Sequence, residues 1–330
     1  MSELRKNPIV DRWVIISTER ANRPVHYGLS NDSSVSACPF CAGNEDKTPP
    51  ELLVFRDKTD SSAAAPWTVR VVPNKYPALV PVDSGSILTG ENEVRSGFGA
   101  HEVIIESPRH VTDMALLSES QFQEIVRAYH DRSKELRADR RFRYILIYKN
   151  QGAKAGATLE HVHSQIIALP MVPAQVLEEI QGSKDYYDLN KRCVFCEMIR
   201  GENGAHQRLV IENRHFIALC PFAPRFAYET WILPKKHASV FEQTAEQHAA
   251  DLGDILRETL VRLGRSLGNP PFNYFIHSNP LAESENDHYH WHLEIMPTLI
   301  QVGGFEWGSG SYINTVTPEQ SARALRNASP

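Results

Sequence analysis

The sequence predicts an α+β protein built from two copies of one unit, each an antiparallel sheet with a covering helix and a zinc site. Two repeated sequence motifs predict this arrangement. Cys38-Pro-Phe-Cys41 is repeated as Cys193-Val-Phe-Cys196, and His161-Val-His163 is repeated as His290-Trp-His292. A third observation is the length, because 330 residues with 42% apolar side chains can form two domains with cores of their own. A repeat of this length indicates a duplicated domain.

Each copy shows the same order of predicted elements. Ser118 and Gln121 form a capping-box motif, and Thr244 and Gln247 form the matching motif in the second copy. Both motifs precede an apolar pattern of helical period, and Gly268 predicts the end of the second helix. Stretches rich in β-branched and aromatic residues then predict a strand, a loop and a strand in each copy, with mostly antiparallel pairing.

Composition predicts the connections between these elements. Polar residues with Ala and Ser predict loops over 57–65 and 83–96. We expect the break between the copies within residues 181–191, which gives an N-terminal catalytic half, 1–182, and a C-terminal half, 183–330.

Charge and hydropathy exclude several classes of partner. The formal charge of −5 argues against a nucleic-acid-binding surface, which needs a basic excess. No run of apolar residues approaches the length of a membrane span, and the polar residues 1–7 lack a signal-peptide core. We therefore expect a cytoplasmic protein with reduced cysteines, in which clustered thiols bind metal.

The repeated cysteine pairs predict two structural zinc sites, because two thiolates and two imidazoles are ligands that zinc prefers. Buried cysteines and core histidines without metal are the alternative, which explains the repeated ligand order poorly. The two predicted ligand sets are Cys38, Cys41, His110 and His161, and Cys193, Cys196, His237 and His290. Cys220 has no partner at this spacing and is expected to be a buried thiol.

His163 is the predicted catalytic residue. Along a strand, His161, His163 and Gln165 share one face. Because zinc takes His161, His163 remains for chemistry beside a loop with Asn150 and Gly156, whose amide groups can surround a phosphate. An imidazole facing phosphorus can form a phosphoramidate. The Gln165 amide, unlike a third histidine, cannot activate water, which favours transfer over hydrolysis.

The run from Asn150 through Gly156, His161 and His163 to Gln165 resembles the active-site segment of the galactose-1-phosphate uridylyltransferases, a branch of the histidine-triad superfamily. The resemblance covers nearly the whole chain. It implies duplicated histidine-triad-like domains, a homodimer, and ping-pong exchange of UMP between UDP-glucose and galactose 1-phosphate, a reaction of galactose metabolism. Nucleotide sugar and sugar phosphate would then be the partners.

The resemblance also implies roles for individual residues. His163 matches the nucleophile, Gln165 the amide at the phosphate, and the first thiol–imidazole set the zinc ligands of the family. Further matches are Asn74 at the nucleoside, Arg20 and Arg23 near the site, and Phe305 and Glu306, which would reach the sugar phosphate from the other subunit.

Departures from the family pattern affect the substrate and the second metal. The family's best-known members have His-Pro-His where this chain has His161-Val-His163, and a sugar-phosphate lysine where it has Ile300. Their second metal site uses one Glu and three His, for which Glu179, His277, His290 and His292 are candidates, so iron stays an alternative to zinc there.

The cysteine pair at 193 and 196 and the missing lysine resemble a related branch, the ADP-glucose phosphorylases, which transfer AMP to phosphate. Adenylyl transfer is therefore the main alternative. A histidine-triad nucleotide hydrolase is disfavoured by Gln165, and a non-enzymatic zinc-ribbon adaptor is disfavoured by the acidic charge. Because Glu294 replaces Gln165 in the second copy, we expect His292 to be packed or metal-bound rather than catalytic, and His277 to lie in the core or an interface.

Overall fold

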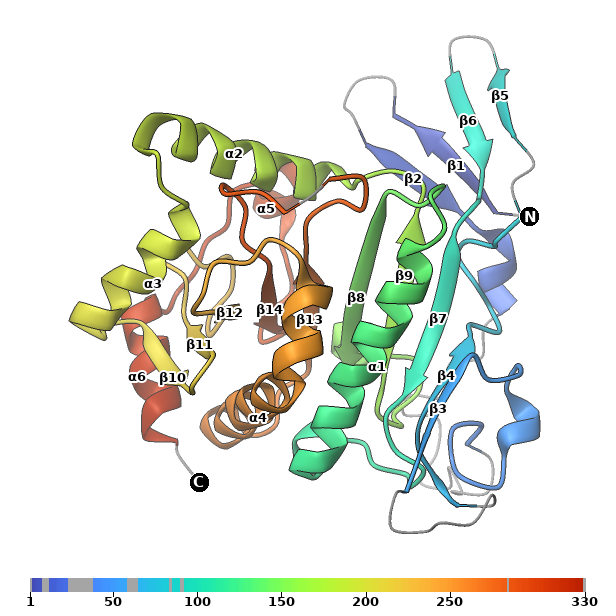
Figure 1. Ribbon diagram of the computed structural model, residues 1–330, viewed down its shortest axis with the longest axis horizontal. Coiled ribbons are helices and arrows are strands. Elements are labelled where there is room, and N and C mark those ends of the chain that lie inside the picture. The colour runs from blue at the N-terminus through green and yellow to red at the C-terminus, as the bar shows by residue number, and fades with distance from the viewer. Residues whose placement is uncertain are drawn as a thin grey trace.

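The computed structural model describes residues 2–7, 12–22, 38–57, 65–82, 85–89, 92–283 and 285–328. Within this part of the chain, ten strands form one antiparallel sheet that runs through both halves (Figure 1). In chain order its strands are β3 (Leu53–Arg56), β4 (Trp67–Pro73), β7 (Ala100–Ile105), β8 (Tyr144–Gln151), β9 (His163–Leu169), β10 (Leu209–Glu212), β11 (Phe216–Leu219), β12 (Thr230–Pro234), β13 (Phe272–His277) and β14 (His292–Pro297).

The two halves meet in the middle of this sheet. Its spatial order is β10-β11-β12-β14-β13-β8-β9-β7-β4-β3, so β13 of the second half pairs with β8 of the first. Phe272 lies opposite Gln151 and Ile276 opposite Ile147 in that pair. The predicted antiparallel pairing is confirmed, but the halves share one continuous sheet where we expected one sheet each. The reason is that each half alone would leave an edge strand with unpaired backbone groups.

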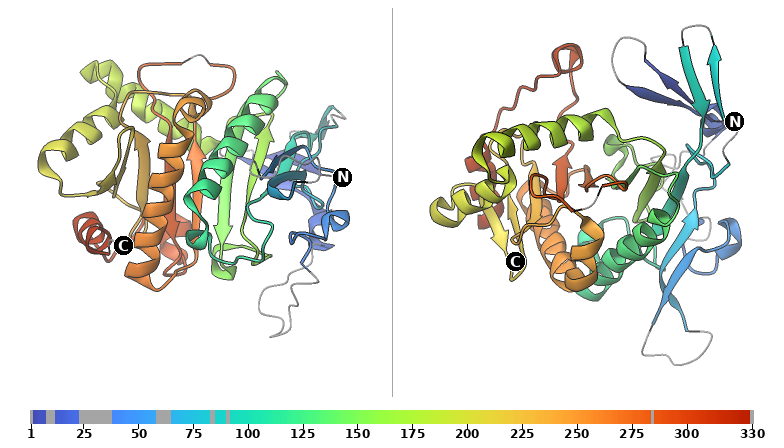
Figure 2. Two further views of the ribbon diagram at one scale, coloured as in Figure 1. Left: turned by 60° about the horizontal axis from the view of Figure 1, so that its bottom comes forward. Right: turned by 45° about the horizontal axis from the view of Figure 1, so that its top comes forward.

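Two long helices, α1 (Glu119–Arg137) and α4 (Phe241–Leu267), lie side by side on one face of the sheet (Figures 1 and 2). Ser118 caps α1 as predicted, with its Oγ accepting from the backbone N–H of Gln121 at 3.3 Å. Gly268 ends α4 in the left-handed conformation, also as predicted.

The predicted start of α4 is wrong. This helix begins at Phe241, three residues before Thr244, because Ser278 supplies a hydrogen-bond acceptor there: the backbone N–H of Phe241 donates to Ser278 Oγ at 3.0 Å. The buried apolar side chains of α1 and α4, with the sheet beneath them, form the main core.

Shorter elements surround this core. Helix α2 (Ala174–Asn190) runs along one end of the sheet and contains most of the segment in which we expected the break between halves (Figure 1). It ends at Lys191, whose φ is 55°. The remaining helices are α3 (Val194–Ala205), α5 (Gly304–Ser309) and α6 (Pro318–Asn327), and the 3-10 turns are η1 (Thr18–Asn22), η3 (Glu45–Lys47), η4 (Met114–Leu116) and η5 (Ala153–Ala155). None of the helices in the described ranges is long and apolar enough to cross a membrane.

A second sheet projects from the N-terminal half (Figures 1 and 2). Its strands are β1 (Glu3–Lys6), β2 (Trp13–Ile16), β5 (Ser86–Thr89) and β6 (Asn92–Ser96), in the order β2-β1-β6-β5. The prediction of a loop over 83–96 is therefore wrong, because β5 and β6 lie within it. β5 and β6 pair with each other, and β6 also pairs with β1, so backbone hydrogen bonds within this sheet hold these polar residues in strands. Most of the other predicted loop, 57–65, lies outside the described residues.

Candidate functional site

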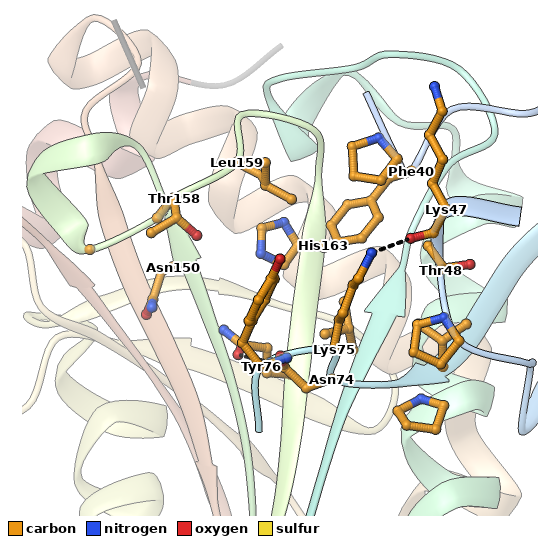
Figure 3. Close-up of a pocket in the computed structure, with 18 residues that line it drawn as sticks. Phe40, Lys47, Thr48, Asn74, Lys75, Tyr76, Asn150, Thr158, Leu159 and His163 are labelled. Carbon is orange, nitrogen blue, oxygen red and sulfur yellow. Dashed lines mark hydrogen bonds between the residues drawn. The ribbon is translucent and has the colours of Figure 1, made fainter. Parts of the chain in front are cut away.

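A cavity of about 310 Å³ opens at the ends of β4, β7, β8 and β9 in the N-terminal half. Figure 3 shows His163 at its centre, with Phe40 and Lys47 to one side and Asn150 and Thr158 to the other. The structure thus brings together five residues for which the sequence predicts a role in catalysis or substrate binding. They are Asn74, Asn150, Gly156, His163 and Gln165, and all line this cavity.

The imidazole of His163 is held in one tautomer. Its Nδ1 lies 2.7 Å from the carbonyl oxygen of His161, which can only accept a hydrogen bond, so Nδ1 carries the hydrogen. In the neutral ring the lone pair is then on Nε2. The ring of Phe40 packs edge-on against His163 at a centroid distance of 5.3 Å, and the side chain is 7% exposed. The arrangement presents a nucleophilic nitrogen in a mostly buried setting.

The loop before β9 curves around this imidazole. Gly152 and Gly156 have φ values of 89° and 85°, which L side chains rarely adopt. The two glycines allow the chain to turn through η5 while Asn150 stays at the cavity wall.

A buried ion pair holds the backbone of His163 from the interior of the sheet. The Lys149 ammonium pairs with Glu106 and also donates to the carbonyl oxygen of His163 at 3.0 Å. Tyr129 Oη donates to Glu106 at 3.3 Å. Burial lowers the pKa of Lys149 even though Glu106 acts to raise it. The first residue of β9 is therefore fixed through its backbone.

The first cysteine motif, Cys38 to Cys41, lies against two histidines next to the cavity. Cys38 Sγ lies 3.5 Å from His161 Nδ1, and Cys41 Sγ lies 3.4 Å from His110 Nδ1. His161 lies two residues before His163, the first residue of β9, so the two rings are not on one strand as we expected. Its Nε2 donates to the carbonyl of Ser107 at 2.8 Å, and burial lowers its pKa to about 4. Neutral His161 therefore turns its Nδ1 lone pair toward the thiols.

The second cysteine motif is arranged in the same way. Cys196 Sγ lies 3.4 Å from His237 Nδ1 and 3.7 Å from His290 Nδ1. His237 Nε2 donates to the carbonyl of Asn286 at 2.9 Å, and His290 Nε2 to that of Pro234 at 3.0 Å. These outer hydrogen bonds fix the tautomer that leaves Nδ1 as a ligand.

Both clusters fit a tetrahedral metal ion. The four ligand atoms of each cluster lie within 4.8 Å of one another. Zinc with bonds of about 2.3 Å to sulfur and 2.0 Å to nitrogen places tetrahedral ligand atoms about 3.5 Å apart, which matches the sulfur–nitrogen distances above. Each set supplies four ligands, so such an ion would have no open position and would be structural.

A third group of titratable side chains joins a residue of α2 to three residues of the C-terminal half. Glu179, His277, His292 and Glu294 come within 4.8 Å of one another, and Arg225 pairs with Glu294. Burial alone would lower the pKa of His292, but Glu179 and Glu294 outweigh it and raise the pKa to about 9.

This group differs from the set that the family pattern suggested for a second metal. His290 belongs to the cysteine cluster, and Glu294 lies in the group in its place. His277 is 4% exposed and donates to Glu179 at 2.9 Å, so it is a core histidine with a carboxylate partner. Cys220 is fully buried, as predicted.

Three other predicted substrate-binding residues, Arg20, Phe305 and Glu306, are not among those that line the cavity. Arg20 Nη1 donates to the carbonyl of Tyr76 at 2.6 Å, next to the cavity wall. Arg23 lies outside the described residues. Phe305 and Glu306 lie on α5, where Phe305 is 54% exposed and Glu306 accepts from the backbone N–H of Gly303 at 3.0 Å. Neither of the two lines the cavity of this chain.

Several cavity residues escaped sequence reasoning. Phe40 lies between the first two cysteines, and Lys75 and Tyr76 follow Asn74, so their neighbours were the available signal. Lys47 and Thr48 carry no recognisable pattern. Lys75 Nζ lies 3.4 Å from the carbonyl of Lys47 across the cavity mouth (Figure 3).

Comparison with known proteins places these observations in a wider context. The family model for the galactose-1-phosphate uridyl transferase N-terminal domain matches residues 1–173, and one for a domain of unknown function matches residues 91–327. An ADP-glucose phosphorylase of Arabidopsis thaliana is 39% identical over 99% of this chain and 93% of its own length. A galactose-1-phosphate uridylyltransferase of Thermotoga maritima is 29% identical over 99% of this chain and 98% of its own. A crystal structure of the Arabidopsis thaliana ADP-glucose phosphorylase with bound ADP-glucose superposes with a TM-score of 0.78, at 37% identity and full coverage of both chains.

Proposed function

The chain belongs to the galactose-1-phosphate uridylyltransferase family of nucleotidyltransferases, and from this premise we propose that it transfers a nucleoside monophosphate between a nucleotide sugar and a phosphate acceptor through a covalent bond to His163. The observation that carries the proposal is the fixed tautomer of His163. Its Nδ1–H is engaged by the carbonyl of His161, so Nε2 carries the lone pair, in a cavity that also holds the amides of Asn150 and Gln165.

In the first displacement, Nε2 of His163 attacks the α-phosphorus of the nucleotide sugar. A nitrogen–phosphorus bond forms, the bond from that phosphorus to the bridging oxygen breaks, and hexose 1-phosphate leaves. The imidazole becomes positively charged in the adduct. The carbonyl of His161, already 2.7 Å from Nδ1, stabilises that charge.

In the second displacement, a phosphate oxygen of the acceptor attacks the same phosphorus and His163 is released. The amide groups of Asn150 and Gln165 are placed to donate hydrogen bonds to the phosphoryl oxygens in both steps. Among the described residues that line the cavity, His163 is the one histidine. This favours one nucleophile that acts twice.

Metal would support the site without entering the reaction. The first ligand set suits zinc, which would tie the segment that contains the first cysteine pair to the turn before β9. This set is Cys38, Cys41, His110 and His161. Because His161 also accepts from His163, a metal there would keep the nucleophile in place. The second set, Cys193 and Cys196 with two histidines, suits zinc by the same argument.

The first reaction to test is exchange of UMP between UDP-glucose and galactose 1-phosphate, the activity for which the family is named. Phosphorolysis of ADP-glucose is the second candidate. Two observations favour it: the relative with 39% identity is an ADP-glucose phosphorylase, and Ile300 stands where uridylyltransferases of the family have the lysine for sugar phosphate.

Assembly and location are part of the proposal. We place the protein in the cytoplasm as a homodimer in which Phe305 and Glu306 of one subunit contact the sugar phosphate of the other. The exposed side chain of Phe305 on α5 is compatible with such a contact. We also propose that residues 1–182 and 183–330 are duplicated units, of which the first is catalytic and the second has lost its reactive centre.

Labelling with each donor tests the proposal. The protein is incubated separately with UDP-glucose and ADP-glucose carrying radioactive α-phosphorus, quenched, and assayed for protein-bound label. An acid-labile, alkali-stable label that is absent in His163→Asn supports the proposed function, and the donor that reacts faster identifies the base. Release of free UMP or AMP without an acceptor would indicate a hydrolase, and no label from either donor would refute the proposal.

A further inference from the structure

We propose that His101 and Asn273 are positioning residues that force the amides of Gln165 and Asn150 to present N–H groups, rather than oxygens, to a bound phosphate. The inference deepens the proposed function and rests on it, because it assigns a substrate phosphate to this cavity. Two hydrogen-bond relays carry it, and each begins at a backbone atom whose role as donor or acceptor is fixed.

The first relay begins at the backbone N–H of Ala78, which can only donate. It lies 3.0 Å from His101 Nδ1, so this nitrogen is the acceptor and Nε2 of the neutral ring carries the hydrogen. His101 Nε2 in turn lies 2.9 Å from Gln165 Oε1. A nitrogen that donates must face the oxygen of the amide, so His101 determines which end of the Gln165 side chain it meets.

A second contact fixes Gln165 in the same sense. The backbone N–H of Tyr76 donates to Asn74 Oδ1 at 2.9 Å, which leaves Asn74 Nδ2 to donate to Gln165 Oε1 at 3.4 Å. Tyr148 Oη also donates to that oxygen, at 3.1 Å. Among the described residues, Gln165 Nε2 has no protein partner and is not a buried unpaired atom, so its hydrogens face the cavity that Gln165 lines.

The other relay begins at the carbonyl oxygen of Ala155, which can only accept. Asn273 Nδ2 donates to it at 2.8 Å and also lies 2.7 Å from the Asn150 amide. The Asn150 atom at that distance must therefore be Oδ1. Its Nδ2 is turned toward the glycine loop, 3.8 Å from where a side chain at Gly156 would begin.

Asn273 comes from the C-terminal half. It lies on β13, directly opposite Asn150 of β8 in the pair that joins the two halves. The second half thus contributes to the site through the central pair of the sheet, although none of its described residues lines the cavity. The contact predicts that catalysis depends on a strand far from His163 in sequence.

The consequence is a cavity that selects an anion. Phosphoryl oxygens only accept, so an amide that presents N–H is attractive and a flipped amide, which presents its oxygen, is repulsive. Loss of one such donor lowers the rate of group transfer by about 10²-fold in comparable sites. We expect losses of that order when a relay is broken.

Variants of His101 separate the relay from a purely structural role. His101→Leu removes both hydrogen bonds, whereas His101→Gln can still accept from Ala78 and donate to Gln165. We expect the rate constant for adduct formation on His163 to fall about 10²-fold in the first variant and to stay within a few-fold in the second. His130→Leu, at a mostly buried histidine on α1, is the matched control and should leave the rate unchanged.

The relay also predicts a coupling. Because His101 acts through Gln165, His101→Leu should have little further effect in a Gln165→Ala background. Asn273→Asp tests the second relay independently. A carboxylate of the same size can only accept hydrogen bonds, so it would draw Asn150 Nδ2 away from the cavity. We expect that variant to lower the adduct rate at least 10-fold, with less change in KM than in kcat.

The outcomes distinguish this inference from the proposed function. If wild type forms the adduct and folded His101→Leu and Asn273→Asp form it equally fast, the relays are refuted and the function stands. If the wild-type protein forms no adduct with either donor, the proposed function fails, and the affinities for UMP and AMP, measured by calorimetry, test the relay instead. A 10-fold weaker affinity in His101→Leu but not in His101→Gln still supports the relay, and equal affinity in all variants overturns it.

Discussion

Replacing Lys149 by methionine is expected to destabilise the protein strongly while leaving its shape unchanged. The side chain is 1% exposed, and its ammonium pairs with Glu106, which is fully buried. Methionine fills the same volume but leaves the Glu106 carboxylate without its counter-ion. Removing one partner of a buried ion pair costs about 3–5 kcal/mol, because the remaining charge is desolvated and uncompensated. We expect a loss of that size in the free energy of unfolding.

Two companion variants test the cause. In the double variant Lys149→Met, Glu106→Gln, the buried charge is gone and Tyr129 keeps a hydrogen-bond acceptor. Its stability should therefore return to within about 2 kcal/mol of wild type. Lys184→Met breaks an ion pair with Asp188 on the exposed surface of α2 and should leave the free energy of unfolding nearly unchanged, because solvent screens that pair.

Urea unfolding followed by tryptophan fluorescence measures these differences, since the chain has five tryptophans. The comparison needs the midpoint and the slope, because a changed slope would indicate a changed unfolded state. A Lys149→Met variant within about 1 kcal/mol of wild type would refute the reasoning. So would a double variant no more stable than the single one.

Three further predictions concern the site and its supports. His163→Asn should form no nucleotidyl adduct and lose at least about 10³-fold in kcat with its fold intact, as circular dichroism and steady-state assays can show. Cys41→Ser should lower the zinc content by one ion per chain in atomic absorption, whereas Cys220→Ser, at a buried thiol outside both clusters, should retain two; equal metal content in both variants would contradict the ligand assignment. His292, whose pKa is raised to about 9 by Glu179 and Glu294, stabilises the fold in its charged form, fully below its ordinary pKa near 6.5 and less as the pH rises through 9. The free energy of unfolding should therefore fall between about pH 6.5 and 9, and His292→Phe should flatten that slope.

The features that could be predicted from the sequence are mainly those encoded by repeated motifs. The motifs at Cys38 and Cys193 differ at one position, and the histidines that join them in space stand at matched places in the two copies. Antiparallel pairing and the cap at Ser118 also followed from local chemistry. Such features depend on residues close together in sequence or on a pattern that occurs twice.

Features that depend on tertiary contacts were not predictable. Thr244 has the sequence of a helix cap, but the helix begins earlier, at Phe241, whose backbone N–H donates to Ser278 Oγ. The pairing of β13 with β8 cannot be derived from either strand, yet it places Asn273 beside Asn150. Lys47 reaches the cavity only because the segment after the first cysteine motif folds over it. No local pattern marks any of these.

The most direct test of the account is to locate the covalent adduct. The protein is mixed with excess UDP-glucose or ADP-glucose, quenched in alkali within one turnover, digested, and analysed by mass spectrometry. The account predicts that one uridylyl or adenylyl group is attached to the peptide containing His163, that fragmentation places it on this imidazole, and that galactose 1-phosphate or phosphate discharges it. An adduct on another residue, or turnover of either nucleotide sugar without any adduct, would contradict the central role of His163.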